Sequence, residues 1–468
     1  MKYQPNKSRN YGVNLCEGCL EKQREIDRLR EEVQRLKAQL NQRQRKQQEG
    51  MFGSSTPSSL RPLKANSDEN KRANPGGAKN GHLGHGRSSC SAAEADEIRR
   101  VELKDRCPDC GGQLGAPSVR ARTVTDIEPV VVKRICYELE RRSCPHCRKS
   151  FQSQAPEVLP KALLGNQLLG EIVGEHYLQG VPLSSITRRF GLNLGTVIEA
   201  LHRLGGIFQP ALKQLKEEYR NAPVRHADET GWRTDGRNGY SWLFCTDQVS
   251  LCLYRQTRSA SVVREVLGEK ELDGVLVVDR YNGYNRVKCR IQYCYAHLMR
   301  DVEDLRDEFA DQAEVQSFAT TVIPLLAEAM HLHSKPLGDE QYYREASKIK
   351  GEIESAMKAE ARHPGVRTMQ DLFVEKAERM YHWASDRGVP ADNNRAEREL
   401  RPTVIARKVS FGSQSEGGAK TRETLMSVMQ TLKKRVKDPI REFKQVLDEL
   451  ALNAKLDVVK AVFPVESG

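Results

Sequence analysis

An alternation of strand-like and helix-like segments, beginning at residue 221, constrains the fold of this 468-residue chain more than any other feature. Three strand-like segments come first, followed by a helix, a strand, a short helix, a strand and a longer helix. In order, the strands and main helices read APVRHADETGW, YSWLFCT, SLCLYRQT, SASVVREVLG, DGVLVVDRYNGY and RIQYCYAHLMRDVEDL. This order predicts a ribonuclease-H-like core, an α/β fold in which helices flank a mixed sheet.

Two aspartates stand at the ends of strands in this pattern. Asp228 ends the first strand and Asp279 ends the fourth. In this topology the two strands are neighbours, so their carboxylates are expected to meet at one edge of the sheet. Two bare carboxylates that close repel each other, and a divalent cation such as Mg²⁺ removes that cost. A third carboxylate would allow two ions, which can stabilise the attacking and leaving oxygens of a phosphodiester displacement.

A helix in the segment ADNNRAERELRP is the candidate source of the third carboxylate. Asp392 or Asn393 can cap its start, and Pro402 is expected to force its end. The run of acids and arginines in this segment is equally typical of a solvated helix face.

Helix geometry limits which acid of this segment can enter a site. Ala396 and Leu400 define the expected buried side of the helix, and Glu397 and Glu399 lie on opposite flanks of that side. At most one of the two glutamates can therefore face the aspartates. Geometry alone does not say which one.

Two CPxC motifs predict a zinc ribbon in residues 96–155. They contain Cys107 with Cys110 and Cys144 with Cys147, and β-rich sequence lies between them. Four thiolates suit a closed, structural Zn²⁺ site, and so small a segment would need the metal to fold. The alternative is four thiols without a metal.

Residues 156–215 are predicted to form a helical DNA-binding region of the helix-turn-helix type. In VPLSSITRRFGLNLGTVIEALHRL, Gly191 supplies the turn, and Ser184 or Ser185 can cap the first helix. An ordinary helical hairpin is the alternative. Three cations of this region suit contacts with a phosphate backbone: Arg188, Arg189 and Arg203.

The N-terminal part combines a short helix with a linker. A heptad seam runs through Ile26, Leu29, Val33, Leu36 and Leu40. It predicts a coiled-coil helix within residues 1–50 that contributes weakly to dimerisation. Cys16 and Cys19 precede it, and they are either free thiols or half of a metal site shared between two chains. Residues 51–95, rich in Ser, Pro, Gly and basic side chains, predict a basic flexible linker.

The remaining segments complete the expected domain organisation. Residues 305–385 contain amphipathic segments that predict a helical insertion within the core. The core is then expected in two parts, residues 216–304 and 386–415. Further helices are expected in residues 416–468.

The charge balance of the chain favours a polyanionic partner. Lys and Arg outnumber Asp and Glu, 75 to 63, for a net charge of +12. Such a balance favours nucleic acid. No apolar run approaches the roughly 20 residues of a membrane helix, and the N-terminus lacks the apolar core of a secretory signal. No membrane contact is expected, and the protein is predicted to be cytoplasmic and associated with the nucleoid when bound to DNA.

Four motifs together resemble those of the insertion-sequence 66 family of transposases. They read HADETGW, VVDRYNGY, CYAHLMRD and DNNRAERELRPTVIARK, and the resemblance extends over nearly the whole chain. It implies an Asp-Asp-Glu triad in a ribonuclease-H-like core, and by motif the triad is Asp228, Asp279 and Glu397. The family usually reads GRK where this chain has Ala406, a departure that concerns a loop detail rather than the triad.

The resemblance also implies an activity. The protein would bind the terminal inverted repeats of its element, hydrolyse the DNA 3′ ends and join them to target DNA. The triad would hold Mg²⁺ or Mn²⁺ for two in-line attacks at phosphorus, without a covalent protein–DNA intermediate. Handling two double-stranded ends together implies a homo-oligomer. Members of this family often work with two small accessory proteins encoded beside them.

Other polar residues around the triad are weaker candidates. His297 could orient phosphate or water, with a buried, hydrogen-bonded histidine as the alternative. Glu229 follows Asp228 on its strand and is expected to point to the opposite face. Three cations of the fourth motif suit contacts with DNA phosphates: Arg398, Arg401 and Lys408.

Two other functions fit the same residues. A metal-dependent nuclease without strand transfer would share the acids but would not need to recognise paired ends. A non-catalytic DNA-binding regulator would use only the ribbon and the helix-turn-helix.

Overall fold

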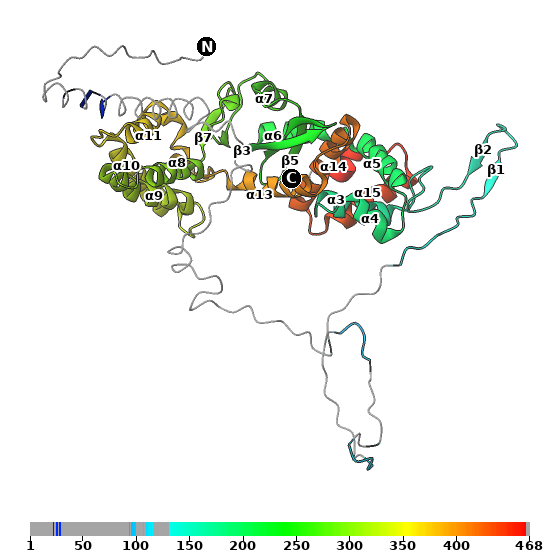
Figure 1. The fold of residues 1–468 in the computed structure, drawn as a ribbon. Coiled ribbons are helices and arrows are strands. Elements are labelled where there is room, and N and C mark those ends of the chain that lie inside the picture. Colours follow the sequence, from blue (N-terminus) through cyan, green and yellow to red (C-terminus); the bar gives the residue numbers. More distant parts are fainter. Residues whose placement is uncertain are drawn as a thin grey trace, which may run out of the picture. The chain divides into compact units, whose positions relative to one another are not determined.

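The computed structural model describes residues 131–464 without a gap and, ahead of them, residues 22, 25, 26, 28, 29, 93, 95–99, 106, 109–113 and 115. The chain divides into two compact units, Pro62–Cys136 in one and Met1–Arg61 with Tyr137–Gly468 in the other. Every helix and strand named below belongs to the second unit (Figure 1).

A five-stranded sheet carries the residues of interest, and its strand order is β5-β4-β3-β6-β7. The first three strands form an antiparallel meander, whereas β6 runs parallel to β3 and to β7. The strands are β3 (Val224–Thr234), β4 (Arg237–Cys245), β5 (Ser250–Arg255), β6 (Val275–Val278) and β7 (Arg290–Tyr293). The order of strands and helices predicted from residue 221 onwards is confirmed, because α7 (Ala260–Leu267), η3 (Asn282–Tyr284) and α8 (Tyr295–Glu308) occupy the expected places.

The tight connection between β3 and β4 follows from two residues. Asp235 and Gly236 both have positive φ, 52° and 70°. An Asp-Gly pair in this conformation makes the two-residue turn whose twist matches an antiparallel hairpin. The register that results pairs Thr234 with Arg237 and Asp228 with Leu243.

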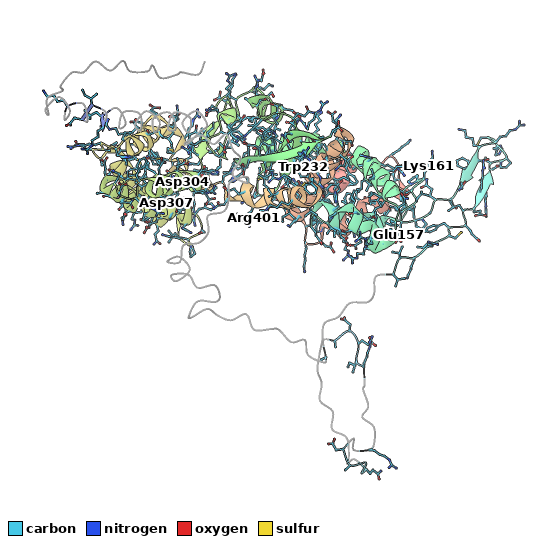
Figure 2. The ribbon with its side chains drawn as sticks, in the orientation of Figure 1. Glu157, Lys161, Trp232, Asp304, Asp307 and Arg401 are labelled. Atoms are coloured by element: carbon cyan, nitrogen blue, oxygen red, sulfur yellow. The ribbon has the colours of Figure 1, made fainter. Side chains whose placement is uncertain are left out.

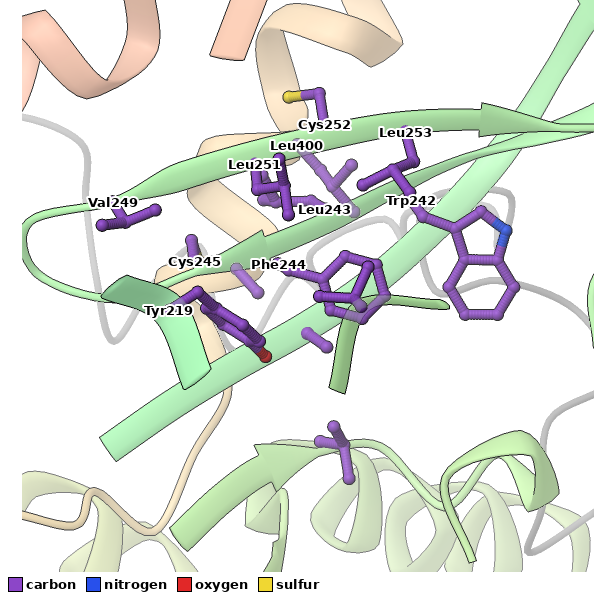
Figure 3. Packing of buried hydrophobic residues seen from close by; sticks show 14 of the residues in the cluster. Tyr219, Trp242, Leu243, Phe244, Cys245, Val249, Leu251, Cys252, Leu253 and Leu400 are labelled. Carbon is purple, nitrogen blue, oxygen red and sulfur yellow. The ribbon is translucent and has the colours of Figure 1, made fainter. Parts of the chain in front are cut away.

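Helices cover the two faces of the sheet with different residues. On one face, Tyr219 of α6 (Ala211–Asn221) packs edge-on against Phe244 of β4, with ring centroids 5.7 Å apart. On the other face, α13 (Asn394–Ser410) packs against β3 and β4. Figure 3 shows Tyr219 next to the Phe244 strand and Leu400 of α13 close to Leu243. Leu400 and Leu243 are both buried.

The edge strand β5 is covered by α14 (Glu416–Arg435), which supplies hydrogen-bond acceptors that a neighbouring strand would otherwise supply. Three α14 side chains one turn apart accept from alternate backbone N–H groups of β5: Thr431 Oγ1 from Ser250 at 3.1 Å, Ser427 Oγ from Cys252 at 2.9 Å, and Glu423 Oε2 from Tyr254 at 3.2 Å. Unpaired edges invite pairing with another chain, so α14 closes this side of the sheet.

The segment between β7 and α13 is helical, as predicted for residues 305–385. Its elements after α8 are α9 (Ala313–Leu332), α10 (Asp339–Lys358), α11 (Pro364–Glu375), η4 (Ala377–Arg379) and α12 (His382–Ser385). They lie at the β7 end of the sheet in Figure 1, whereas α14 lies at the β5 end. The C-terminal helices are α14, α15 (Pro439–Leu452) and α16 (Val458–Val462).

The helices before α6 include the predicted pair joined at Gly191. They are α3 (Asn166–Tyr177), α4 (Leu183–Phe190) and α5 (Leu194–Phe208). Gly191 has φ 63° and ψ 37°, the left-handed conformation that glycine adopts easily at a helix end. The cap prediction was wrong. Helix α4 begins at Leu183 after Pro182, with no side-chain cap, so Ser184 and Ser185 lie inside its first turn.

Helix α13 contradicts the prediction that Pro402 ends it. The helix continues through Pro402 to Ser410. Ala406 is therefore a buried helix residue, and the prediction that it belongs to a loop was wrong. A proline removes one backbone hydrogen bond, but Leu400, Thr403 and Ala406 on either side of it are buried against the sheet. Packing of the buried face therefore outweighs the local cost, as it does for most helices in proteins. The predicted buried positions Ala396 and Leu400 are confirmed at 0% and 2% exposure.

Several N-terminal predictions lie outside the described residues. Of the heptad helix, Ile26 and Leu29 are described; both are helical and exposed. Cys16, Cys19 and the linker fall on residues that are not described. Within the described part of the chain, no helix combines the length and apolar character needed to cross a membrane.

Candidate active site

The register of two parallel strands brings Asp228 and Asp279 to the same level. His226 of β3 pairs with Val277 of β6. Two residues further on are Asp228 and Asp279, and Asp279 directly follows β6. Contrary to the prediction, Asp228 does not end its strand, because β3 continues to Thr234. Extended by two residues, the register would set the two aspartates side by side, and the charge of Asp279 helps to raise the pKa of Asp228. Both side chains point to the same face because side chains alternate along a strand. Both are buried, at 2% and 3% exposure.

The N-terminus of α13 is pinned to the strand that carries Asp228. Asn393, fully buried, accepts a hydrogen bond from His226 Nδ1 at 2.9 Å and donates one to Ala227 O at 2.8 Å. Its own N–H lies 3.1 Å from Cys294 Sγ. The side chain of Asn393 therefore does not cap the helix, and Asp392 Oδ1 instead accepts from Asn394 N at 2.9 Å.

The C-terminal half of α13 is held to the same strand. Arg407 Nη1 donates to Thr230 Oγ1 at 2.8 Å and to Gly231 O at 2.7 Å. With Asn393 at one end and Arg407 at the other, α13 lies along β3 on the face of Asp228.

This placement separates the two glutamates that helix geometry left undecided. Glu397 Oε1 accepts from Arg300 Nη2 at 3.2 Å and lies 3.9 Å from His297 Nε2. Its side chain is 24% exposed. Its charge acts on Asp228, whose pKa it helps to raise. Glu397 is thus on the side of the aspartates.

Glu399 has different partners. Its carboxylate accepts from Ser250 Oγ at 2.7 Å and pairs with Lys434 Nζ of α14 at 2.8 Å. These contacts join α13 to α14 and to the start of β5. Glu399 therefore serves the packing of the helices against the sheet.

The electrostatics around Asp228 show an excess of negative charge. Burial is the largest cause that raises its pKa well above the ordinary value of an aspartate, followed by the charges of Glu229, Asp279 and Glu397. A hydrogen bond from Glu229 N to Asp228 Oδ1, 2.8 Å long, acts in the opposite direction. A bound cation would relieve the repulsion.

Glu229 points to the opposite face from Asp228, as predicted. There Tyr284 Oη donates to its Oε2 at 2.7 Å, and Arg258 Nε donates to its Oε1 at 2.7 Å. Burial first and the charge of Asp279 second raise the pKa of Glu229 to about 7, whereas Arg258 and Tyr284 act to lower it.

This Glu229 cluster supports the loop that carries Asp279. The Arg258 guanidinium lies 4.0 Å from the centroid of the Tyr281 ring. Tyr281 N in turn donates to Asp279 Oδ1 at 2.9 Å. None of these partners stood out in the sequence, although Tyr281 and Tyr284 belong to the DRYNGY motif.

The carboxylates fit a hard divalent cation by their chemistry. Mg²⁺ prefers oxygen ligands and one or two carboxylates, and Asp228 and Asp279 are buried, adjacent and acidic. Across the described residues, no three His, Cys, Asp or Glu side chains converge closely enough to hold a metal ion. In this structure Glu397 is paired with Arg300.

Two groups on α8 complete the surroundings. His297 is 4% exposed and lies beside Glu397. One turn on, Asp301 forms a buried ion pair with Arg280, the residue after Asp279. This pair ties the Asp279 loop to α8.

The predicted DNA-contact cations are all exposed. On α13 they are Arg398, Arg401 and Lys408, and Figure 2 labels Arg401 there. In the helix pair, Arg189 is bonded to Glu175 but its side chain is still 52% exposed. Arg203 donates to Pro160 O at 2.5 Å, and Arg188 is exposed on α4.

The second CPxC motif forms a tight hairpin. Strands β1 (Arg141–Ser143) and β2 (Ser150–Gln152) are antiparallel and enclose Cys144 and Cys147. Backbone hydrogen bonds, first from Cys147 and then from His146, lower the pKa of the Cys144 thiol. Cys107 lies outside the described residues, and Cys110 belongs to the other compact unit. The four-cysteine zinc site stays a prediction.

Comparisons with known proteins agree with the motifs. A family model described as "Transposase IS66 family" matches residues 161–421. The chain is similar to two proteins of Sinorhizobium fredii (strain NBRC 101917 / NGR234), both named as uncharacterized. Protein y4qI is 25% identical over 80% of this chain and 76% of its own length. Protein y4hP is 22% identical over 76% of this chain and 73% of its own length.

Proposed function

Because the chain belongs to the IS66 family of transposases, we propose that it binds the inverted-repeat ends of its element, cleaves their 3′ ends and transfers them to target DNA. One observation carries the proposal most: Asp228 and Asp279 stand level on neighbouring strands beneath the helix that brings in Glu397. The strand order β5-β4-β3-β6-β7 supports a ribonuclease-H-like core.

Asp228, Asp279 and Glu397 are the residues that would hold Mg²⁺ or Mn²⁺. When bound there, such ions activate the attacking oxygen and stabilise the leaving oxygen of a phosphodiester. The chain's own contribution is placement. Asn393 and Arg407 hold α13 along β3, and in this way they would bring Glu397 within reach of the aspartates once a cation binds.

Arg300 and His297 would act on the DNA phosphate. The Arg300 side chain is 34% exposed and pairs with Glu397. A guanidinium in this position can exchange a carboxylate for a phosphate oxygen, to which it also bonds strongly. His297, buried beside Glu397, would orient the same phosphate or the attacking water.

Other parts of the chain would bind DNA away from the chemistry. The exposed cations of α13 and of the α4–α5 pair would contact the phosphate backbone. The four cysteines of the CPxC motifs would hold a structural Zn²⁺. Two DNA ends must be handled together, so the protein would act at the nucleoid as a homo-oligomer, and the N-terminal helix would contribute to its assembly. Small accessory proteins of the kind that the family often uses are candidate further partners.

A cleavage and joining assay tests this proposal. The substrate is a labelled duplex that carries the inverted repeat found beside the gene, with Mg²⁺ present. The wild type is expected to cleave and join it. Asp228→Asn, Asp279→Asn and Glu397→Gln are each expected to lose about 10³-fold or more of both activities, because each removes several kcal/mol of transition-state stabilisation.

Glu399→Gln is the matched control for Glu397→Gln. The Glu399 carboxylate belongs to the same helix but is bonded to Lys434. The Glu399→Gln variant is therefore expected to keep both activities and to lose only some stability. Cleavage without a joined product would favour a nuclease. An Asp279→Asn variant that keeps the full biological effect would favour a non-catalytic regulator.

A further inference from the structure

The exposed residues of α13 form one stripe that starts next to Glu397. In chain order they are Arg398, Arg401, Ile405, Lys408 and Val409. Three of the five are cations and none is an acid. The two glutamates of the helix are turned away to Arg300 and Lys434. The stripe therefore combines positive charge with apolar side chains.

Phe411 stands at the end of this stripe, 73% exposed. It is the C-cap of α13, with φ 60° and ψ 3°. This left-handed conformation is usually left to glycine, and it costs a residue with a Cβ roughly 1–2 kcal/mol. The ring recovers little of that cost by burial. An exposed aromatic on a strained backbone indicates a contact made outside the monomer.

The backbone under Phe411 is rigidly supported. Ser413 N donates to Arg233 O at 2.9 Å, and Asp235 N donates to Ser413 O at 3.0 Å. Trp232 Nε1 also donates to Ser413 Oγ at 3.1 Å. At Gly412 an added Cβ would lie 2.2 Å from Arg233 O, so the segment lies directly against β3. The ring is thus presented from a fixed base rather than from a loose loop.

We infer that Phe411 is a stacking platform for an unpaired DNA base. The inference rests on the proposed function, because DNA is the ligand. A flat ring on a fixed support, with Lys408 one turn before it and Arg401 further back along the same stripe, matches the way proteins bind single-stranded nucleic acid. In such proteins cations follow the backbone and aromatic rings stack against the bases.

The site is distinct from the proposed catalytic centre. Phe411 follows Glu397 by fourteen residues, which is roughly 20 Å along a helix axis. Phe411 would therefore stack on an unpaired base that lies several nucleotides from the cleaved phosphate. That base would belong to a DNA strand bound along α13.

Binding of a short oligothymidine and of a duplex of equal length, both fluorescein-labelled and without added Mg²⁺, tests the inference on the full-length chain. Phe411→Ala is expected to weaken binding of the single strand about tenfold and to leave duplex binding within twofold of the wild type. Val374→Ala removes another exposed apolar side chain, 59% exposed on α11, and is expected to change neither.

Phe411→Trp supplies a direct readout. The three native tryptophans are buried, so a new indole at position 411 would be exposed and would report its own surroundings. The variant is expected to bind the single strand like the wild type and to lose fluorescence as a base stacks on it.

Three outcomes would overturn the inference. In the first, Phe411→Ala weakens single-strand and duplex binding equally. In the second, it weakens neither. In the third, it abolishes self-association in sedimentation, which would make this surface an interface between two copies of the chain. A wild-type protein that binds neither DNA would contradict the proposed function itself.

Discussion

At the scale of single residues, buried polar side chains with tertiary partners decide how the site is arranged. Asn393 bridges α13 to β3 across more than a hundred residues of sequence, and it orients Glu397 rather than Glu399 towards Asp228. The buried pair of Glu229 and Arg258 does the same for the Asp279 loop from the opposite face.

His176 is another buried polar residue whose surroundings fix its protonation. Arg422 Nη2 lies 2.9 Å from its Nε2, so this nitrogen must accept, and Nδ1–H then donates to Val181 O at 2.8 Å. Burial first and the charge of Arg422 second lower the pKa of His176 to about 3, whereas the Val181 carbonyl acts to raise it.

This depressed pKa predicts a loss of stability in acid. Between pH 6.5 and pH 3 the unfolded chain binds a proton at His176 that the folded chain does not bind. The stability of the folded state does not depend on this histidine's protonation above pH 6.5, and it decreases as the pH falls from 6.5 towards 3. Between pH 7 and pH 5, we expect the free energy of unfolding of the wild type to fall by about 2 kcal/mol more than that of His176→Gln.

Urea unfolding at the two pH values measures the difference. His331→Gln, a change of an exposed histidine, is the control and is expected to keep the wild-type dependence on pH. Equal acid losses for the wild type and His176→Gln would show that His176 is not held neutral.

At the scale of elements, tertiary packing determines two features of the helices. One helix continues past a proline, and another satisfies the backbone of an edge strand. Helix α13 continues past Pro402 because its buried side spans the proline. Helix α14 satisfies the backbone of edge strand β5 with its own side chains.

The contact between α14 and β5 predicts a stability effect. Ser427→Ala would leave the buried Cys252 N–H without its acceptor and is expected to lower the free energy of unfolding by about 1–3 kcal/mol. Ser355→Ala is the matched control, because its exposed hydroxyl bonds only to Gly351 O within its own helix. It is expected to change stability by less than about 0.5 kcal/mol. Equal effects in urea unfolding would mean that α14 does not protect the edge.

At the scale of the whole molecule, the elements predicted correctly from sequence are those with strong local patterns. The strands from residue 221 onwards follow from β-rich segments and turns, and the meeting of Asp228 with Asp279 follows from strand order alone. The choice between Glu397 and Glu399 could not be derived from geometry, because it depends on where Asn393 and Lys434 lie in space. The resemblance of the motifs supplied it instead.

Two of the wrong predictions share one physical cause. Ser184 and Pro402 were read with local rules for helix ends, yet α4 begins one residue before Ser184 and α13 runs through Pro402. In both helices the buried side chains, such as Ile186 and Leu400, set the extent of the helix. Local signals yield where a continuous apolar face packs on a core.

The account rests on Asp228, Asp279 and Glu397 sharing one divalent cation centre. Iron-directed backbone cleavage tests this most directly: Fe²⁺ replaces Mg²⁺, and ascorbate and hydrogen peroxide are added. The bound Fe²⁺ reduces the peroxide to hydroxyl radicals, which cut the nearest backbone. We predict fragments that end near residues 228, 279 and 397, that disappear with excess Mg²⁺ and that are lost in Asp228→Asn. Cuts confined to other segments, or cuts near only one of the three acids, would contradict the account.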